Sequence, residues 1–298
     1  MNTSTTAAAN LRGIIGMLVS QACFVLNDMF VKLAANEAGL PATQIMALRA
    51  AIAAVGIGGL LYAMNLHREL PRVITSVVLA RNGVEALMAL TFITALAHLP
   101  LGDITTILQV APLCLTVLSV VILREHVGWR RWAAVIVGFI GVVLVVQPTG
   151  EGFNAYALLV LFVALLVAIR DLLTRYLPDD LPSLLVTFAT TIAVGLLGLL
   201  GGLVQAWKPI PAEALFYLIG AAAFITGANF FIVFAFRGVE ISVVSPFRYA
   251  VVVWAMILGF AVWGDIPNEL SFVGAGIIIA SGLYTLHREA LSRRAGRR

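Results

Sequence analysis

The twenty residues "LLVTFATTIAVGLLGLLGGL", positions 184–203, contain no charged side chain. At a rise of about 1.5 Å per residue, a helix of this length crosses the roughly 30 Å hydrocarbon core of a bilayer. Similar apolar runs recur along the 298 residues, of which 61% are hydrophobic and 11% charged. A soluble chain of this length needs more polar surface, and a membrane barrel needs short alternating strands. The sequence therefore predicts an all-α polytopic membrane protein.

Short stretches rich in Pro, Gly and charged residues separate the apolar runs, as is typical of turns. They divide the chain into ten predicted transmembrane helices, at residues 12–34, 42–64, 74–97, 102–123, 129–147, 153–174, 182–206, 213–236, 241–263 and 270–287. Every connection between these ranges is short, so no soluble domain is expected.

The basic residues in the connections, at the termini and near the span ends are divided unevenly between the two sides of the membrane that ten crossings define. One side, with both termini, holds fourteen arginines: Arg12, Arg68, Arg72, Arg124, Arg130, Arg131, Arg170, Arg175, Arg237, Arg288, Arg293, Arg294, Arg297 and Arg298. The opposite side holds only Lys32 and Lys208. Cytoplasmic loops carry such an excess of Lys and Arg, so both termini are predicted to be cytoplasmic. The net charge of +4 thus reflects topology and does not indicate a nucleic-acid partner.

The two halves of the chain show traces of a common pattern. "FITALAHLPLGDITTILQVAP", from Phe92, resembles "FIVFAFRGVEISVVSPFRYA", from Phe231, and "NDMFVK" (27–32) resembles "RDLLTR" (170–175). Because five helices are an odd number, a second copy enters the membrane from the opposite side, which is an inverted repeat typical of secondary transporters. The predicted five-helix repeats are residues 1–148 and 149–298.

These features resemble the drug/metabolite transporter superfamily, specifically its EamA-type ten-helix branch. The motif residues are Pro112, Glu125, Gly138 and Gly141. The second half departs from the pattern, since Asp265 stands where Glu is usual and its proline is Pro246. The chain looks most like bacterial amino-acid and metabolite exporters, including exporters of aromatic amino acids. The resemblance implies alternating access in the bacterial inner membrane, with a central cavity lined mainly by the third, fourth, eighth and ninth helices.

Ionisable side chains within the predicted spans require compensation, because a charge at the bilayer centre is costly. In the third span Arg81 and Glu85 lie one helical turn apart, with Asn82 between them. We interpret them as a structural ion pair, as lining of the cavity, or as both. For Arg49 in the second span two interpretations remain open: a structural partner for a carboxylate, or a gate.

Arg248 in the ninth span is the candidate first contact for a substrate carboxylate, although a snorkelling arginine is the alternative. It follows Pro246, which interrupts backbone hydrogen bonding where a helix can open toward a cavity. Tyr249 and Trp254 are five residues apart, so only one of them is expected to share the direction of Arg248. Gln109 occupies the corresponding repeat position in the fourth span.

Further candidates complete the predicted site. The candidate substrate-binding residues are Arg81, Asn82, Glu85, Gln109, Asn229, Arg248, Tyr249 and Trp254. Asp28 with Lys32, and Asp171 with Arg175, are expected to be local pairs near helix ends or gates. The candidate gating residues are Asp28, Lys32, Arg170 and Asp171, and the candidate hinges are Pro112 and Pro246.

Several function classes find no support in the sequence. It contains no G-x-x-x-x-G-K-[ST] loop and no HExxH motif, its four histidines lack metal-ligand spacing, and Cys23 and Cys114 fall inside apolar spans. We therefore predict a transporter without enzymatic activity, cofactor or metal.

Its predicted function is secondary export of amino acids or related metabolites, with protons as a candidate coupling ion through Glu85, Asp28 and Asp171. The alternative is a multidrug or nucleotide-sugar carrier of the same fold.

Overall fold

The computed structural model describes residues 3–124, 128–147, 154–178, 180–236 and 244–295. Within these ranges the regular structure is entirely helical. The elements are α1 (Thr3–Asn36), α2 (Ala42–Ala63), η1 (Leu66–Val73), α3 (Ser76–Leu96), α4 (Leu101–Leu108), α5 (Ala111–Leu123), α6 (Trp129–Val146), α7 (Tyr156–Thr174), α8 (Ser183–Gly201), α9 (Ala212–Phe236), η2 (Ser245–Tyr249), α11 (Ala250–Trp263) and α12 (Glu269–Ala295).

Eight segments in the described part of the chain are long and apolar enough to cross a membrane, and two shorter apolar helices, Trp132–Val146 and Glu269–Thr285, accompany them. Large apolar side chains such as Val55, Leu79 and Val253 are exposed on the outside, as suits contact with lipid. The prediction of an all-helical, polytopic membrane protein is confirmed. Each range expected to be a span contains helix in its described part.

Two of the expected spans are not single helices. The fourth divides into α4 and α5 at Gln109 and Val110. Because Pro112 has no N–H, the carbonyl of Leu108, four residues earlier, loses its α-helical donor. In the ninth, Pro246 lies in the short 3-10 helix η2, which continues into α11. Glu125 lies outside the described residues.

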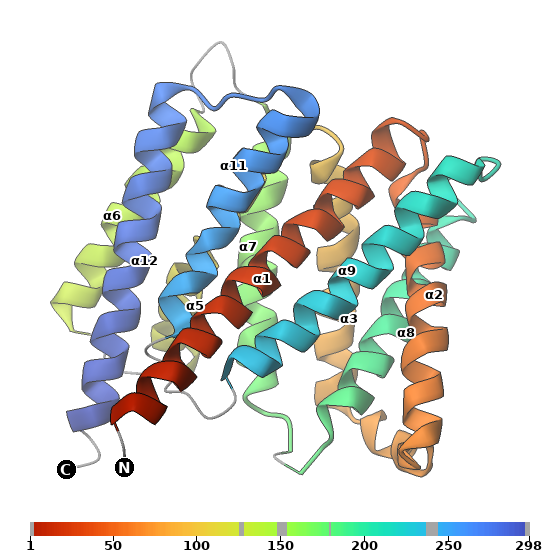
Figure 1. The fold of residues 1–298 in the computed structure, drawn as a ribbon, viewed down its shortest axis with the longest axis horizontal. Coiled ribbons are helices and arrows are strands. Elements are labelled where there is room, and N and C mark those ends of the chain that lie inside the picture. The colour runs from red at the N-terminus through yellow and green to blue at the C-terminus, as the bar shows by residue number, and fades with distance from the viewer. Residues whose placement is uncertain (1–2, 125–127, 148–153, 179, 237–243, 296–298) are drawn as a thin grey trace.

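The helices of the first half pack against those of the second. The α1 helix packs along α9, α2 along α8, α3 along α7 and α8, and α6 along α12. In Figure 1 α1 begins and α12 ends at the same end of the molecule, where the α2–α3 and α7–α8 connections also lie. The α1–α2 and α11–α12 connections lie at the opposite end. The core is therefore shared between both halves and is not divided into two lobes.

Glycines allow the closest of these contacts. A Cβ on Gly198 of α8 would lie 2.7 Å from the backbone of Thr43 and Ala47 in α2, and a Cβ on Gly141 of α6 would lie 2.9 Å from the carbonyl of Gly274 in α12. Real Cβ atoms do not approach so closely. Small residues at these positions bring the helix backbones together, as is common between membrane helices.

Candidate functional site

Glu85 lies where α3 meets α7, and two arginines bind it. Arg170 of α7 places Nη1 3.4 Å from Glu85 Oε2, and Arg81 places Nη2 4.0 Å from the same oxygen. All three side chains are at most a quarter exposed. The expected Arg81–Glu85 pair is present, but the shorter ion pair joins Glu85 to the other half of the chain. Arg170 is a predicted gating residue, so the structure brings members of both predicted groups together.

Arg81 is further fixed by two threonines that the sequence did not single out. Its Nε donates to Thr174 Oγ1 at 3.0 Å, and its Nη1 donates to Thr190 Oγ1 at 2.9 Å. Thr190 Oγ1 is 2.8 Å from Oδ1 of the buried Asn82. The guanidinium thus connects α3 to both α7 and α8. Threonine is common in membrane helices, so the sequence alone does not distinguish Thr174 and Thr190 from other threonines. Their contact with Arg81 can be recognised only from the packing of these three helices.

The charges of this group are balanced. Arg170 donates to Asp171 Oδ1 from Nη2 at 2.7 Å and from Nε at 3.0 Å, in addition to its contact with Glu85. Two guanidinium groups, of Arg81 and Arg170, therefore face two carboxylates. Such pairing is what makes ionised side chains tolerable in a low-dielectric surrounding. We call Arg81, Asn82, Glu85, Arg170 and Asp171 the central cluster.

Arg49 of α2 lies between the central cluster and α1. Its Nη1 donates to Asn27 Oδ1 at 3.2 Å, and Asn27 Nδ2 donates to Asp28 Oδ1 at 2.9 Å. Asp28 and Glu85 are the carboxylates that act on Arg49 electrostatically. Arg49 thus reaches Asp28 through Asn27, and its two interpretations, a structural partner for a carboxylate or a gate, both stay open. Asn27 is a further residue that sequence reasoning missed.

Lys32 does not pair with Asp28 as expected. It is 5% exposed, and its Nζ donates to the carbonyl of Leu99 at 2.7 Å and lies 4.0 Å from Asp265 Oδ2 and 4.7 Å from the centre of the Trp263 ring. The physical reason is that the Leu99 carbonyl lies just before α4, outside the hydrogen-bond ladder of that helix, and accepts from a cation. This contact joins α1 to the α3–α4 connection and to the end of α11.

The remaining candidates stand apart from the central cluster. Asn229 is exposed and donates to the carbonyl of Ile225 in its own helix at 2.8 Å, and Arg248 is exposed in η2. Trp254 is half-buried against the main core. Among the described residues, no hydrogen bond or ion pair joins Asn229 or Arg248 to the central cluster. The interpretation of Arg248 as the first contact for the substrate therefore remains a prediction.

Tyr249 and Gln109 have different surroundings. The buried hydroxyl of Tyr249 finds no hydrogen-bond partner among the residues that the structure describes, and it lies where a Cβ on Gly282 would be. Gln109 is half-buried at the break between α4 and α5. A groove of about 380 Å³ between α6 and α12 includes none of the predicted substrate-binding residues.

Eight apolar segments of membrane-crossing length in the described part of the chain, around paired and partly buried charges, are features typical of a helical membrane transport protein. The chain belongs to the EamA-like transporter family, which matches residues 11–147 and again residues 154–286. It is 28% identical to the riboflavin transporter of Vibrio cholerae, over 96% of this chain and 97% of that protein. It is 29% identical to the S-adenosylmethionine uptake transporter of Rickettsia prowazekii, over 65% of each chain.

An exporter is also among its relatives. The pseudopaline exporter CntI of Pseudomonas aeruginosa is 24% identical, over 90% of this chain and 94% of that protein. A solved crystal structure shares the fold, with a TM-score of 0.56 and 17% identity over 96% of this chain and 99% of the other. The chain is therefore a small-molecule transporter of the EamA-like family, and it is not an enzyme.

Proposed function

We propose that the protein is a secondary transporter that exports amino acids or related small metabolites across the bacterial inner membrane by alternating access. The observation that carries this proposal is the central cluster, in which charges from both halves of the chain meet within membrane-crossing helices. Charges at that depth are costly and mark substrate or ion pathways.

The proposed architecture is two inverted five-helix repeats, residues 1–148 and 149–298. Two features support it: the family matches the chain twice, once in each half, and the helix contacts form matching pairs when the halves are exchanged. The α1–α9 contact then corresponds to α7–α3, α2–α9 to α8–α3, and α5–α7 to α11–α1, while α2–α8 and α6–α12 correspond to themselves. A pseudo-twofold axis in the membrane plane would produce this pattern.

The proposed orientation has both termini in the cytoplasm. The arginine excess on one side supports it, as does the position of the start of α1 and the end of α12 at one end of the molecule (Figure 1). In this orientation the Lys32–Leu99 contact closes the side away from the cytoplasm. We assign Lys32 and Asp28, with Arg170 and Asp171, to gating, and Pro112 and Pro246 to the helix hinges.

The central cluster suits a zwitterion. The 3.4 Å and 4.0 Å separations around Glu85 exceed the roughly 2.7–2.9 Å of a well-formed charge-assisted hydrogen bond. A substrate carboxylate can therefore compete with Glu85 for Arg81 or Arg170, and a substrate ammonium can compete for Glu85. Asn82 supplies an amide beside them. Gln109, Asn229, Arg248, Tyr249 and Trp254 are proposed to contribute when the helices rearrange.

A flux assay with the protein in liposomes tests the proposal. The panel consists of labelled amino acids, riboflavin, S-adenosylmethionine, aromatic cations and nucleotide sugars, each with and without a proton gradient. We expect amino-acid flux that falls at least about tenfold in Arg170→Gln, the size of losing one charge-assisted contact, and that is retained in the exposed control Arg68→Gln. Folded protein that moves only cations or nucleotide sugars would support the alternative function and exclude this one.

Direction and coupling need their own measurement. The relatives include one named for uptake and one named for export, so flux is measured from both faces of oriented vesicles. Protons are proposed to couple through Glu85, Asp28 or Asp171. Gradient-driven flux that is unchanged in Glu85→Gln would exclude Glu85 as the coupling group.

A further inference from the structure

A groove on the outside of the molecule has a composition unlike that of the central cluster. It lies between the first turns of α6 and the middle of α12, has a volume of about 380 Å³, and is lined by Trp129, Arg130, Ala133, Ala134, Val137, Ala280, Ser281 and Tyr284. This volume falls within the range of about 300–1,000 Å³ that is typical of ligand pockets.

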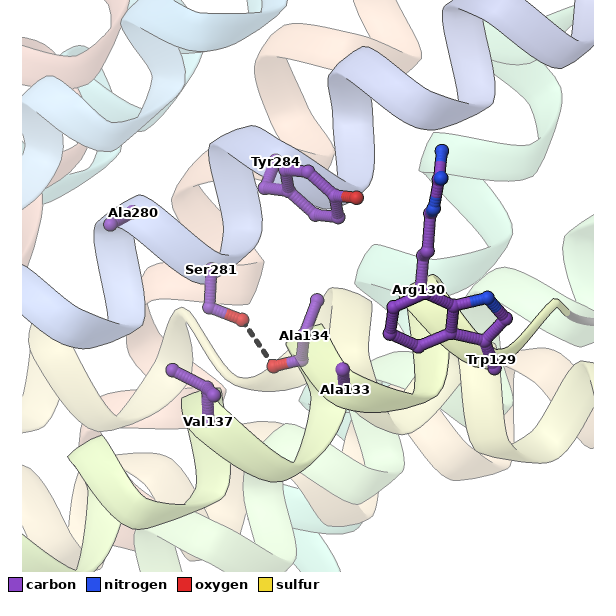
Figure 2. A pocket seen from close by; sticks show the side chains of 8 residues that line it. All are labelled: Trp129, Arg130, Ala133, Ala134, Val137, Ala280, Ser281 and Tyr284. Carbon is purple, nitrogen blue, oxygen red and sulfur yellow. Dashed lines mark hydrogen bonds between the residues drawn. The ribbon is translucent and has the colours of Figure 1, made fainter.

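The packing of α6 and α12 explains why the groove forms there. The helices are in tight contact at Gly141 and Gly274, where a Cβ on either glycine would lie within 3.0 Å of the other's carbonyl and of a side chain of the facing helix. Nearer the start of α6, Ser281 Oγ donates to the carbonyl of Ala134 at 2.5 Å, and Figure 2 shows this bond among the residues that line the groove. Around this bond the groove is lined by small side chains, among them Ala133 and Ala280, which leave space between the two helices.

The interior and the rim of the groove differ in chemistry. The walls are alanine and valine, and the Ser281 hydroxyl is already bonded to Ala134. At the rim stand Trp129, 74% exposed, and Tyr284, 42% exposed, which are the side chains that prefer the membrane–water interface. Figure 2 shows Arg130 extending from the first turn of α6 on the side where Tyr284 lies.

Arg130 places a guanidinium group at this rim. It stacks on Trp129, 5.6 Å from the ring centre, and in the described part of the chain no carboxylate forms an ion pair with it. The neighbouring surface of α6 is apolar, since Ile136, Phe139 and Ile140 are all exposed. The apolar slot matches the acyl chain of an acidic phospholipid. The aromatic side chains and the cation at its mouth match the anionic head group.

We propose that this groove binds an anionic phospholipid of the arginine-rich side, which is the cytoplasmic leaflet in the proposed orientation. An acyl chain lies between Ala133, Val137 and Ala280, and the phosphate accepts hydrogen bonds from Arg130. The alanine and valine walls offer a soluble polar metabolite no polar side chain, and the proton of the Ser281 hydroxyl is already donated to Ala134. Basic pockets between helices on the cytoplasmic side are suited to such head groups.

The test uses the purified full chain, stripped of lipid in detergent and titrated with phosphatidylglycerol or phosphatidylcholine. Native mass spectrometry counts the retained lipids. We expect tight retention of one phosphatidylglycerol in preference to phosphatidylcholine, and about fivefold weaker binding in Arg130→Gln, which is the usual effect of one interfacial arginine. The matched control Arg68→Gln removes an exposed arginine from η1, far from the groove in sequence, and should bind like the wild type.

A second variant fills the slot without changing charge. Ala280→Trp is expected to abolish retention of that lipid, while thermal unfolding checks that the protein is folded. Equal weakening in Arg130→Gln and Arg68→Gln would overturn the proposal in favour of diffuse attraction to the surface. Wild-type binding in Ala280→Trp, or displacement of the lipid by soluble glycerol phosphate at the same concentration, would also overturn it. So would spontaneous disulfide linkage of two Tyr284→Cys chains in membranes, because a second copy would then cover the groove.

Discussion

Glu85 of α3 is 3.4 Å from Arg170 of α7, and this ion pair is shorter than the one it forms with Arg81 of its own helix. The closer of the two ion pairs of Glu85 therefore joins the two halves of the chain, while the shortest pair of the central cluster, Arg170–Asp171, lies within α7. Because both arginines contact Glu85, its removal takes away the carboxylate that they share and leaves two guanidinium groups beside Asp171, which binds Arg170.

Glu85→Gln should consequently lower stability. We expect a loss of about 1–3 kcal/mol in the free energy of unfolding, the range for leaving partly buried polar or charged groups without a partner. The measurement is unfolding in mixed micelles followed by circular dichroism. The double variant Glu85→Gln/Arg170→Gln should regain part of the loss, and Glu213→Gln on the exposed start of α9 should have none. Unfolding of Glu85→Gln at the wild-type midpoint would contradict the assignment of this pair.

The two candidate arginines can be separated by transport. Arg170 lies within the central cluster, whereas Arg248 is exposed in η2. Arg170→Gln should reduce the maximal rate and the apparent affinity together, because both the pair with Glu85 and a substrate contact are lost. Arg248→Gln should mainly change the apparent affinity. The measurement is initial flux against substrate concentration, and equal effects of both substitutions would place Arg248 in the same site.

Lys32→Met should open the end of the molecule at which Lys32 lies. The substitution removes the bond to the Leu99 carbonyl and the ion pair with Asp265. Ala95→Cys, at a position that is fully buried, reports the change when Cys23 and Cys114 are replaced by serine. Labelling of this cysteine by a membrane-impermeant maleimide should be several-fold faster in Lys32→Met. Lys208→Met removes a cation from the α8–α9 connection and serves as the control, and unchanged labelling in Lys32→Met would exclude the gate.

Gly141 and Gly56 offer a matched pair of substitutions. A Cβ at Gly141 would meet the Gly274 carbonyl and Ile278, both at 2.9 Å, so Gly141→Ala should cost about 1–3 kcal/mol by forcing α6 and α12 apart. Nothing lies within 4 Å of a Cβ at Gly56, so Gly56→Ala should stabilise α2 by up to about 1 kcal/mol. Both values come from unfolding in mixed micelles. A stabilising Gly141→Ala would show that the two helices can separate without cost.

The helices could be predicted from the sequence because lipid imposes a length and an apolar composition on each one. The positions of Arg81, Glu85 and Asp171 within their helices were equally readable. Their partners were not, because periodicity places a side chain on a face but does not say which helix covers that face. Glu85 was therefore expected to pair with Arg81 four residues away, whereas Arg170 lies 85 residues further along the chain.

Lys32 shows the same limit in another form. Its local partner, Asp28, is the one that helical spacing suggests, and its actual acceptor is a main-chain carbonyl in a distant connection. No side-chain type signals such an acceptor. The break before Pro112 was different, since a missing N–H is a local property that can be read directly from the sequence.

The pairing of helix contacts between the halves has a consequence for how this protein can evolve. In the proposed repeat each helix interface in one half has a counterpart in the other. When the transporter moves between its inward-facing and outward-facing conformations, each interface takes on the arrangement that its counterpart had before. A substitution in only one copy then changes the two conformations unequally. The balance between them is set by the divergence of the duplicated halves: Lys32 against its counterpart Arg175, and Asn27 against Arg170. Substitutions that accumulate at such positions would shift the equilibrium between the inward-facing and outward-facing conformations of the substrate-free protein without altering its fold.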